Sequence, residues 1–340
     1  QLLISSIEMK PVSSIPSLLF CLLLFGCDEP FDPKGAFEET LVVYSLLTNK
    51  ADTQYVRIYS SYDTGGYDPL ENSSDTPVRN AVVRMSEGQR TYFFRETMVE
   101  RHDKSRYTND IPAYAAFPFR AEPGKTYSLT VETQSNKRAT ATVSVPSHGT
   151  INIENRALAQ NPWLDGEDLT LKIQLSNAAK GFLVRVYLEY DVFVPGTGWE
   201  ERANELPTVF SKEDSIDTYN GTFPSLTRRT SPLVNFNVPL GSSSYEYVHF
   251  PIGNYRTLIK LVRSAYHIDN LRFKHLSVRL VQVDQMFYNY YNIVNGFGDQ
   301  ASIRVDQPDV TNIKGGIGIL GAFTETTLLY ELPPGIGFNR

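Results

Sequence analysis

The stretch Leu169-Thr170-Leu171-Lys172-Ile173-Gln174-Leu175 alternates apolar and polar residues without interruption, and residues 182–190 (FLVRVYLEY) follow with a similar alternation. A period of two residues places every second side chain on the same face, which is typical of a half-buried β-strand. Only a short segment containing Asn177 and Gly181 separates the two strands. Their spacing therefore predicts a β-hairpin.

Strand-like patterns continue from this region in both directions. They lie at 41–46, 54–59, 81–85, 91–94, 127–131, 139–145 and 275–282. Many short strands with turns between them are typical of antiparallel sandwiches. We therefore predict a mainly β fold with two β-sandwich-like domains, an Ig/transthyretin-like sandwich at 36–147 and a second β-rich domain at 148–340.

One short helix is expected near 284–295. Asp284 is a suitable N-cap, and Phe287, Tyr290, Tyr291 and Val294 follow the i, i+3, i+4, i+7 spacing of one helix face. The glycine-rich stretch 315–318 is followed by neither the Lys-Ser/Thr pair nor the helix pattern of a phosphate-binding loop. Those glycines instead indicate a strand that packs closely against another backbone.

The N-terminal residues read as an export signal. Met9-Lys10 is the natural start, an apolar run extends from 18 to 25, and a small Gly26 precedes Cys27. Leu24-Phe25-Gly26-Cys27 resembles the lipobox of bacterial lipoproteins, in which the cysteine is acylated. We expect a signal peptide at 1–26, a lipidated (palmitate-bearing) Cys27, and a tether over 27–35 that holds the protein at a membrane.

Asp28 and Glu29 directly follow this cysteine. They are either a solvated acidic stub or a sorting signal, because acidic residues at this place resemble the signal that carries some lipoproteins to the outer face of the outer membrane. The outer membrane is the expected location, and both orientations, surface and periplasmic, stay open.

Composition excludes several kinds of protein. Cys21 and Cys27 are the two cysteines, so the folded body has neither a disulfide framework nor a cysteine metal site. A net charge of −6 without a basic run argues against nucleic acid and anionic headgroups as partners. The 20 Tyr and 19 Phe are typical of half-buried strands and exported binding surfaces.

No residue set amounts to an active site. The five histidines form no i, i+4 pair, there is no G-x-S-x-G elbow, and the acidic segment 63–75 lacks EF-hand spacing. We expect no catalytic residue, no metal and no cofactor. Four aromatic residues in polar, loop-like surroundings could stack on a sugar or a peptide, or else cap the ends of a core: Trp163, Trp199, Tyr245 and Tyr247.

The order of features resembles domain-of-unknown-function family 4249, a group of outer-membrane lipoproteins from the Bacteroidetes lineage. The residues that carry the resemblance are Cys27, the Leu41–Tyr44 strand, the 78–83 segment, the Pro-Gly-x-Thr-Tyr-x-Leu stretch, the Tyr-rich helix and 312–322. Residues 76–83 also resemble the transthyretin-like or carboxypeptidase-regulatory-like sandwich. The family resemblance implies a two-part β lipoprotein, often associated with TonB-dependent uptake, and no reaction.

Two functions follow as expectations. The first is a non-catalytic accessory or ligand-binding lipoprotein of an outer-membrane uptake system, with a TonB-dependent receptor as partner. The alternative is a cell-envelope hydrolase that acts on glycan or peptide, with catalytic groups brought together from distant loops.

Overall fold

The computed structural model describes residues 37–62, 76–102, 104, 108–233, 245–296 (backbone only at 293–296), 310–333 and 336. The chain divides into two compact units, Gln1–Glu38 and Glu39–Arg340, and every element below belongs to the second. The predicted signal peptide, the tether with Cys27, Asp28 and Glu29, and the acidic segment 63–75 lie outside the described residues.

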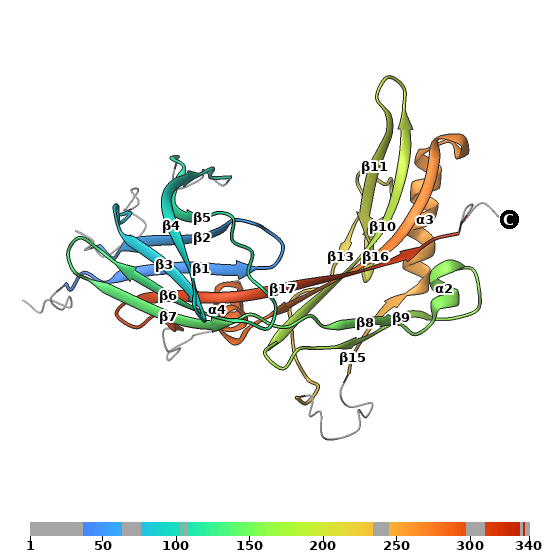
Figure 1. Cartoon of the computed structure of the whole chain (residues 1–340). Coiled ribbons are helices and arrows are strands. Elements are labelled where there is room, and N and C mark those ends of the chain that lie inside the picture. The colour runs from blue at the N-terminus through green and yellow to red at the C-terminus, as the bar shows by residue number, and fades with distance from the viewer. Residues whose placement is uncertain are drawn as a thin grey trace, which may run out of the picture. The chain divides into compact units, whose positions relative to one another are not determined.

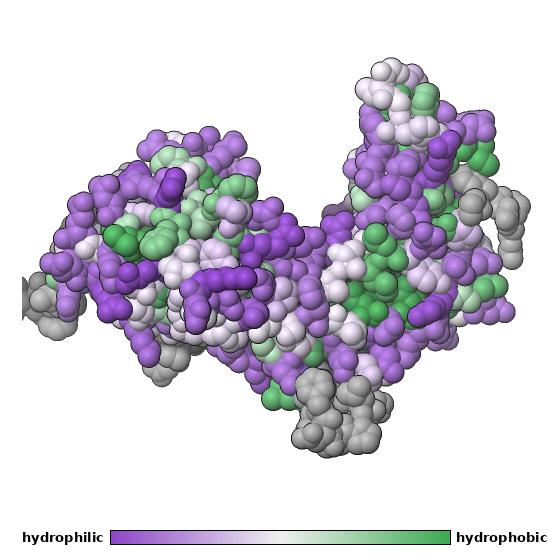
Figure 2. Space-filling view, viewed as in Figure 1, coloured by the Kyte–Doolittle hydropathy of each residue, from purple (hydrophilic) through white to green (hydrophobic). Residues whose placement is uncertain are grey.

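The fold is mainly β, as predicted (Figure 1). On the face shown in Figure 2 the surface is largely hydrophilic, with apolar residues gathered in separate patches. The strands among the described residues are β1 (Leu41–Thr48), β2 (Gln54–Ser60), β3 (Val82–Glu87), β4 (Arg90–Val99), β5 (Ile111–Ala116), β6 (Thr126–Glu132), β7 (Arg138–Ser144), β8 (Thr150–Ile153), β9 (Asp168–Gln174), β10 (Gly181–Val194), β11 (Gly198–Glu205), β12 (Val209–Lys212), β13 (Asn220–Thr222), β14 (Thr227–Arg228), β15 (Glu246–Pro251), β16 (Leu271–Val283) and β17 (Ile317–Glu331).

The predicted helix is confirmed as α4 (Gln285–Gly296), and Asp284 caps it by accepting the backbone N–H groups of Met286 and Phe287 at 3.0 and 3.1 Å. Sequence analysis missed α2 (Arg156–Gln160), α3 (Ile252–Ala265) and a 3-10 turn, η4 (Ile268–Asn270). The start of α3 carries no capping side chain and no acidic residue in its first turn. The usual helix-start signals are therefore absent there.

Most strands belong to one sheet with the order β11-β10-β16-β17-β1-β2-β5-β4-β3-β6-β7. β17 connects its two parts, because it pairs in parallel with β1 over 317–323 and antiparallel with β16 over 323–331. At the far end, Thr140 of β7 exchanges two backbone hydrogen bonds with Lys314, at 2.9 and 2.8 Å. The strands from β17 round to β7 thereby enclose one core.

The predicted hairpin between β9 and β10 is wrong. β9 lies between β8 and β15 in a separate three-stranded sheet, whereas β10 pairs with β11 and β16. β10 has 14 residues and β16 has 13, and they pair along almost their whole length, so β16 offers β10 more cross-strand side-chain pairs than the seven-residue β9 could.

The buried apolar side chains form two clusters. One is built from residues between 151 and 336, including Tyr255 and Leu258 of α3. The other is built from residues between 41 and 145, and it also includes Ile313, Leu320 and Ala322. The C-terminal segment therefore completes the core of the N-terminal strands, and the boundary predicted at 147/148 stays a prediction.

The glycine prediction for 315–318 is confirmed. A Cβ atom on Gly316 would lie 2.6 Å from the carbonyl oxygen of Leu41, and one on Gly318 would overlap the carbonyl oxygen of Val43. Gly318 also has φ +105°, a conformation that L side chains rarely adopt. Glycine at these positions lets β17 lie against β1 at backbone distance.

Candidate functional site

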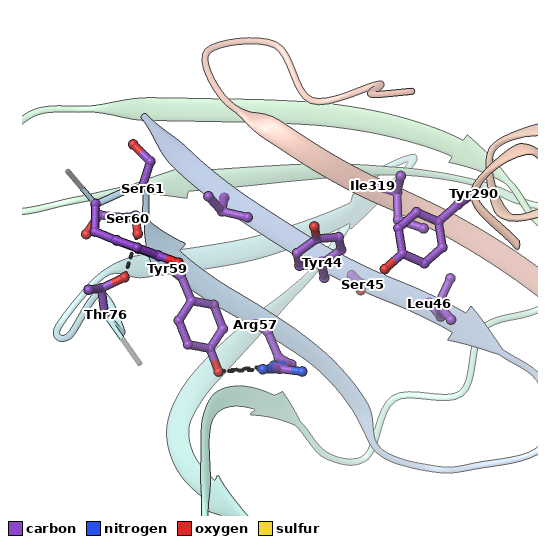
Figure 3. Close-up of a pocket in the computed structure, with 12 residues that line it drawn as sticks. Tyr44, Ser45, Leu46, Arg57, Tyr59, Ser60, Ser61, Thr76, Tyr290 and Ile319 are labelled. Carbon is purple, nitrogen blue, oxygen red and sulfur yellow. Dashed lines mark hydrogen bonds between the residues drawn. The ribbon is translucent and has the colours of Figure 1, made fainter. Parts of the chain in front are cut away.

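A pocket of about 630 Å³ lies on the outer face of β1 and β2 (Figure 3). Alternation in β1 buries Leu41, Val43 and Leu47 in the core and leaves Tyr44 and Leu46 on the opposite face. The pocket is lined by Val42, Tyr44, Ser45, Leu46, Arg57, Tyr59, Ser60, Ser61, Tyr62, Thr76, Tyr290 and Ile319. Its volume is within the range of small-ligand sites.

Strand register brings the central residues together. Tyr44 lies opposite Arg57 in the antiparallel pair β1–β2 and opposite Ile319 in the parallel pair β1–β17. The Tyr290 side chain reaches the same place from α4, with its ring centroid 5.9 Å from that of Tyr44 and the rings inclined by 57°. Residues from three distant parts of the chain thus form one wall (Figure 3).

Asp284 and Phe287 hold α4 over this face. The Asp284 carboxylate accepts the backbone N–H of Ala322 in β17 at 2.9 Å, and the Asp284 backbone N–H donates to the Ala322 carbonyl at 3.0 Å. The Phe287 ring lies 6.0 Å from that of Phe323. These contacts fix the helix on β17 and so position Tyr290.

Arg57 is the one charged residue among the described residues that line the pocket. Its Nε and Nη2 groups donate to the Tyr59 hydroxyl at 3.1 and 2.8 Å, and that hydroxyl donates to the Pro112 carbonyl at 3.5 Å. No carboxylate of the described residues forms an ion pair with Arg57. Within the described ranges, its positive charge is therefore not neutralised by a carboxylate.

Burial raises the pKa of Tyr44, the nearby Tyr290 hydroxyl raises it further, and the positive charge of Arg57 acts in the opposite direction. Tyr44 is consequently neutral at physiological pH. The hydroxyls at the other end of the pocket bind backbone: Thr76 Oγ1 donates to the Ser60 carbonyl at 2.5 Å, and Ser61 Oγ accepts the Thr40 N–H at 2.8 Å.

The pocket is therefore equipped to bind. Its tyrosine rings offer apolar faces with polar edges, and its guanidinium offers fixed donors. Carboxylate, imidazole and thiol groups are absent from the lining residues that the structure describes. General acid–base chemistry usually relies on such groups, so the described pocket has no acid–base pair for hydrolysis.

The four aromatic residues proposed from sequence lie outside this pocket. Trp163 is half-buried against the larger cluster, and Trp199, 38% exposed, lies between the Phe193 ring at 5.6 Å and the Arg272 guanidinium at 3.9 Å. The Tyr245 ring contacts the Lys172 ammonium at 4.1 Å, and Tyr247 pairs with Lys172 across β15 and β9. Only the two tyrosines are brought together, and stacking by any of the four stays a prediction.

Sequence analysis missed Tyr44, Arg57 and Tyr59 as site residues. The available signal was the row Tyr55, Arg57 and Tyr59 at every second position of β2, which places large side chains on the face away from the core. That row becomes a site only through pairing with β1 and cover by α4.

Among the described residues, no group of three or more His, Cys, Asp or Glu side chains could hold a metal ion. Within the same ranges, no helix combines the length and apolar character needed to cross a membrane.

A second polar cluster lies on β10, β11 and β16. The Glu205 carboxylate is near Arg185 Nε at 3.6 Å and accepts a hydrogen bond from the Tyr187 hydroxyl at 3.4 Å. Its Oε1 is buried and has no hydrogen-bond partner among the described residues. Burial raises the pKa of Glu205, and the charges of Arg185 and Arg279 oppose that shift without cancelling it.

This cluster predicts a pH dependence of stability. Because the folded-state pKa of Glu205 is raised, the native state binds its proton more tightly than the unfolded state does, and this stabilisation is lost as the pH rises through the folded pKa. We expect Glu205→Gln to show a shallower fall in unfolding free energy between about pH 4 and pH 7, measured by urea unfolding. Glu122→Gln, an exposed control, should follow the wild type; parallel profiles for Glu205→Gln would contradict the prediction.

The mainly β fold and the tyrosine- and arginine-lined pocket define a β-rich candidate binding protein. The chain belongs to the family described as domain of unknown function (DUF4249), whose model matches residues 28–328. The family predicted from sequence is thus confirmed, while the lipoprotein character and the transthyretin-like N-terminal sandwich stay predictions.

No curated protein matches the chain. Among solved structures, the C-terminal globular domain of an oligosaccharyltransferase from Pyrococcus abyssi is similar, with 13% identity and a TM-score of 0.23. The match covers 75% of this chain and 50% of that one, so the chain spans about half its length. A TM-score this low carries no argument about fold or function.

Proposed function

We propose that this protein is a non-catalytic, lipid-anchored ligand-binding component of an outer-membrane uptake system of the TonB-dependent type. The observation that carries the binding role is the pocket of about 630 Å³, whose described lining holds tyrosines and one arginine and no carboxylate or imidazole. The envelope location rests on the lipobox-like sequence at Cys27 and on the family resemblance.

The alternative, an envelope hydrolase, requires an acid–base or nucleophilic arrangement near a pocket that accepts the substrate. The lining of the described pocket supplies tyrosine, serine and threonine hydroxyls, and those of Ser61 and Thr76 already bind backbone groups. This arrangement favours binding over bond cleavage.

Lipid anchoring is tested by Cys27→Ala. We expect the wild type to incorporate labelled palmitate and to partition with membranes, and the variant to lose both properties because its acylated thiol is gone. Cys21→Ala is the matched control, since Cys21 lies within the expected signal peptide. Membrane partitioning that survives Cys27→Ala would contradict the anchor. Protease treatment of intact cells then distinguishes surface display from a periplasmic position.

The accessory role is tested by crosslinking the native protein in membranes and capturing it. The expected result is co-purification of an outer-membrane TonB-dependent receptor. A protein recovered alone that cleaves glycans or peptides would overturn the proposal. A Tyr44→Ala variant that still captures the receptor would show that receptor binding does not depend on the Tyr44 side chain.

A further inference from the structure

The pocket continues into a second hollow along the same two strands. This hollow, of about 360 Å³, shares Tyr44, Ser45, Leu46 and Arg57 with the pocket and extends to the residues around Tyr55. We call the two hollows together the β1–β2 groove. Arg57 belongs to both, between Tyr55 and Tyr59 on the outer face of β2. Because the groove extends over two adjoining hollows, it suits a ligand made of several linked units more than a single ring compound.

The charge of the groove is positive at its centre. Among the described residues that line the two hollows, Arg57 alone is charged, and none of the described carboxylates pairs with it. Two of its nitrogens donate to Tyr59, which orients the guanidinium along the groove. A half-buried guanidinium that no carboxylate of the described residues pairs with is well satisfied by an anion, and carboxylates match its planar donor geometry.

Strand pairing argues against an extended peptide. β1 is paired on one side with β17 and on the other with β2, and β2 is paired in turn with β5. Peptides that bind sheets commonly add a strand to a free edge, and the groove offers none. The groove instead offers apolar surfaces: the ring of Tyr55 is 44% exposed and the side chain of Leu46 is 38% exposed. The Tyr44 ring lies next to that of Tyr290. Such faces suit the apolar faces of sugar rings.

We propose that the β1–β2 groove binds an acidic carbohydrate chain, with a uronate carboxylate on Arg57 and adjoining sugar rings on Tyr44 and Tyr55. This inference rests on the proposed binding function and names its ligand class. Recognition by side chains alone, with one charge at the centre, predicts selectivity for acidic over neutral sugars of equal length.

The test is calorimetric titration of the full chain with four probes: tetragalacturonate, tetramannuronate, neutral maltotetraose and tetraglutamate. We expect at least one uronate tetramer to bind, maltotetraose and tetraglutamate to bind at least about 10-fold more weakly, and added salt to weaken uronate binding. Arg57→Gln should weaken uronate binding by about 10- to 100-fold, because it removes a charge-assisted pair. Tyr44→Ala should also weaken it.

Arg272→Gln is the matched control, because Arg272 also lies against an aromatic ring, that of Trp199, and belongs to a different part of the sheet. It should bind uronates as the wild type does. Urea unfolding of each variant checks that the fold is intact, and Arg57→Lys, which keeps the charge without the planar fork, should retain part of the affinity.

Uronate binding that is unchanged by Arg57→Gln would overturn the inference, as would equal binding of maltotetraose, a preference for tetraglutamate, or no uronate binding at all. Different results would refute the proposed binding function. Binding of maltotetraose or tetraglutamate that depends on Tyr44 refutes the acidic-sugar inference and leaves the binding function standing. The absence of binding by every probe, together with hydrolysis and a receptor-free capture, refutes both.

Discussion

Gly318→Ala is expected to lower the free energy of unfolding by about 4 kcal/mol. This loss is a large part of the total stability of an ordinary protein. Two causes act together. The residue has φ +105°, which strains any L side chain, and the added Cβ would overlap the carbonyl oxygen of Val43 in β1. Relief would require β17 to move away from β1.

Gly196→Ala is the matched control for Gly318→Ala. Gly196 has φ +95°, and a Cβ there would meet no atom within 4 Å, so the control contains the backbone strain without the overlap. We expect it to cost about 1–2 kcal/mol, and the difference between the two variants measures the close approach of β17 to β1. If urea unfolding gave the two variants equal losses of unfolding free energy, the close contact between β17 and β1 would contribute nothing to the effect of Gly318→Ala.

Asp284→Ala is expected to lower the free energy of unfolding by about 3 kcal/mol. One carboxylate serves two elements: it caps α4 through Met286 and Phe287, and it accepts the buried N–H of Ala322 in β17. Its removal leaves a buried donor without its partner and releases the helix that carries Tyr290. Hydrogen exchange at the Ala322 amide should accelerate with the loss of stability.

Asp284→Asn separates the cap from the charge. Asp284 Oδ1 accepts from both Phe287 and Ala322, and an amide oxygen can replace it there, whereas the bond from Met286 to Oδ2 is lost. Burial raises the pKa of Asp284 against the effect of these N–H donors, so the neutral amide also avoids a desolvated charge. We expect a loss of about 1 kcal/mol. A loss as large as that of Asp284→Ala would contradict the assigned hydrogen bonds.

Local patterns predicted the individual elements well. Period-two alternation identified β9, β10 and much of β16, and the cap and apolar spacing identified α4. The helix α3 shows the limit of this reasoning. Its buried residues Ile252, Tyr255, Leu258 and Val262 follow helical spacing, but the segment directly continues a strand and has no capping side chain.

The candidate site was beyond local reasoning. Tyr44, Arg57 and Tyr290 are separated by many residues, and on each element a single large side chain needs no explanation. They become a pocket because Tyr44 pairs with Arg57 in register and because Asp284 binds α4 to β17. The aromatic residues that sequence analysis selected lie instead on β11, on or directly before β15, and in the segment before β9.

By itself the sequence determined many of the strands, where α4 begins, and that the 315–318 glycines face another backbone, whereas β5, β8 and β15 were not predicted. These properties depend on side-chain period, capping and the absence of a Cβ, all of which act within a few residues. Tertiary structure alone decided that β9 and β10 belong to different sheets, that β17 completes the core of the N-terminal strands, and that a groove forms over β1 and β2. Backbone hydrogen bonds can join any two strands, so the choice of neighbour is made by the burial and register of the whole sheet.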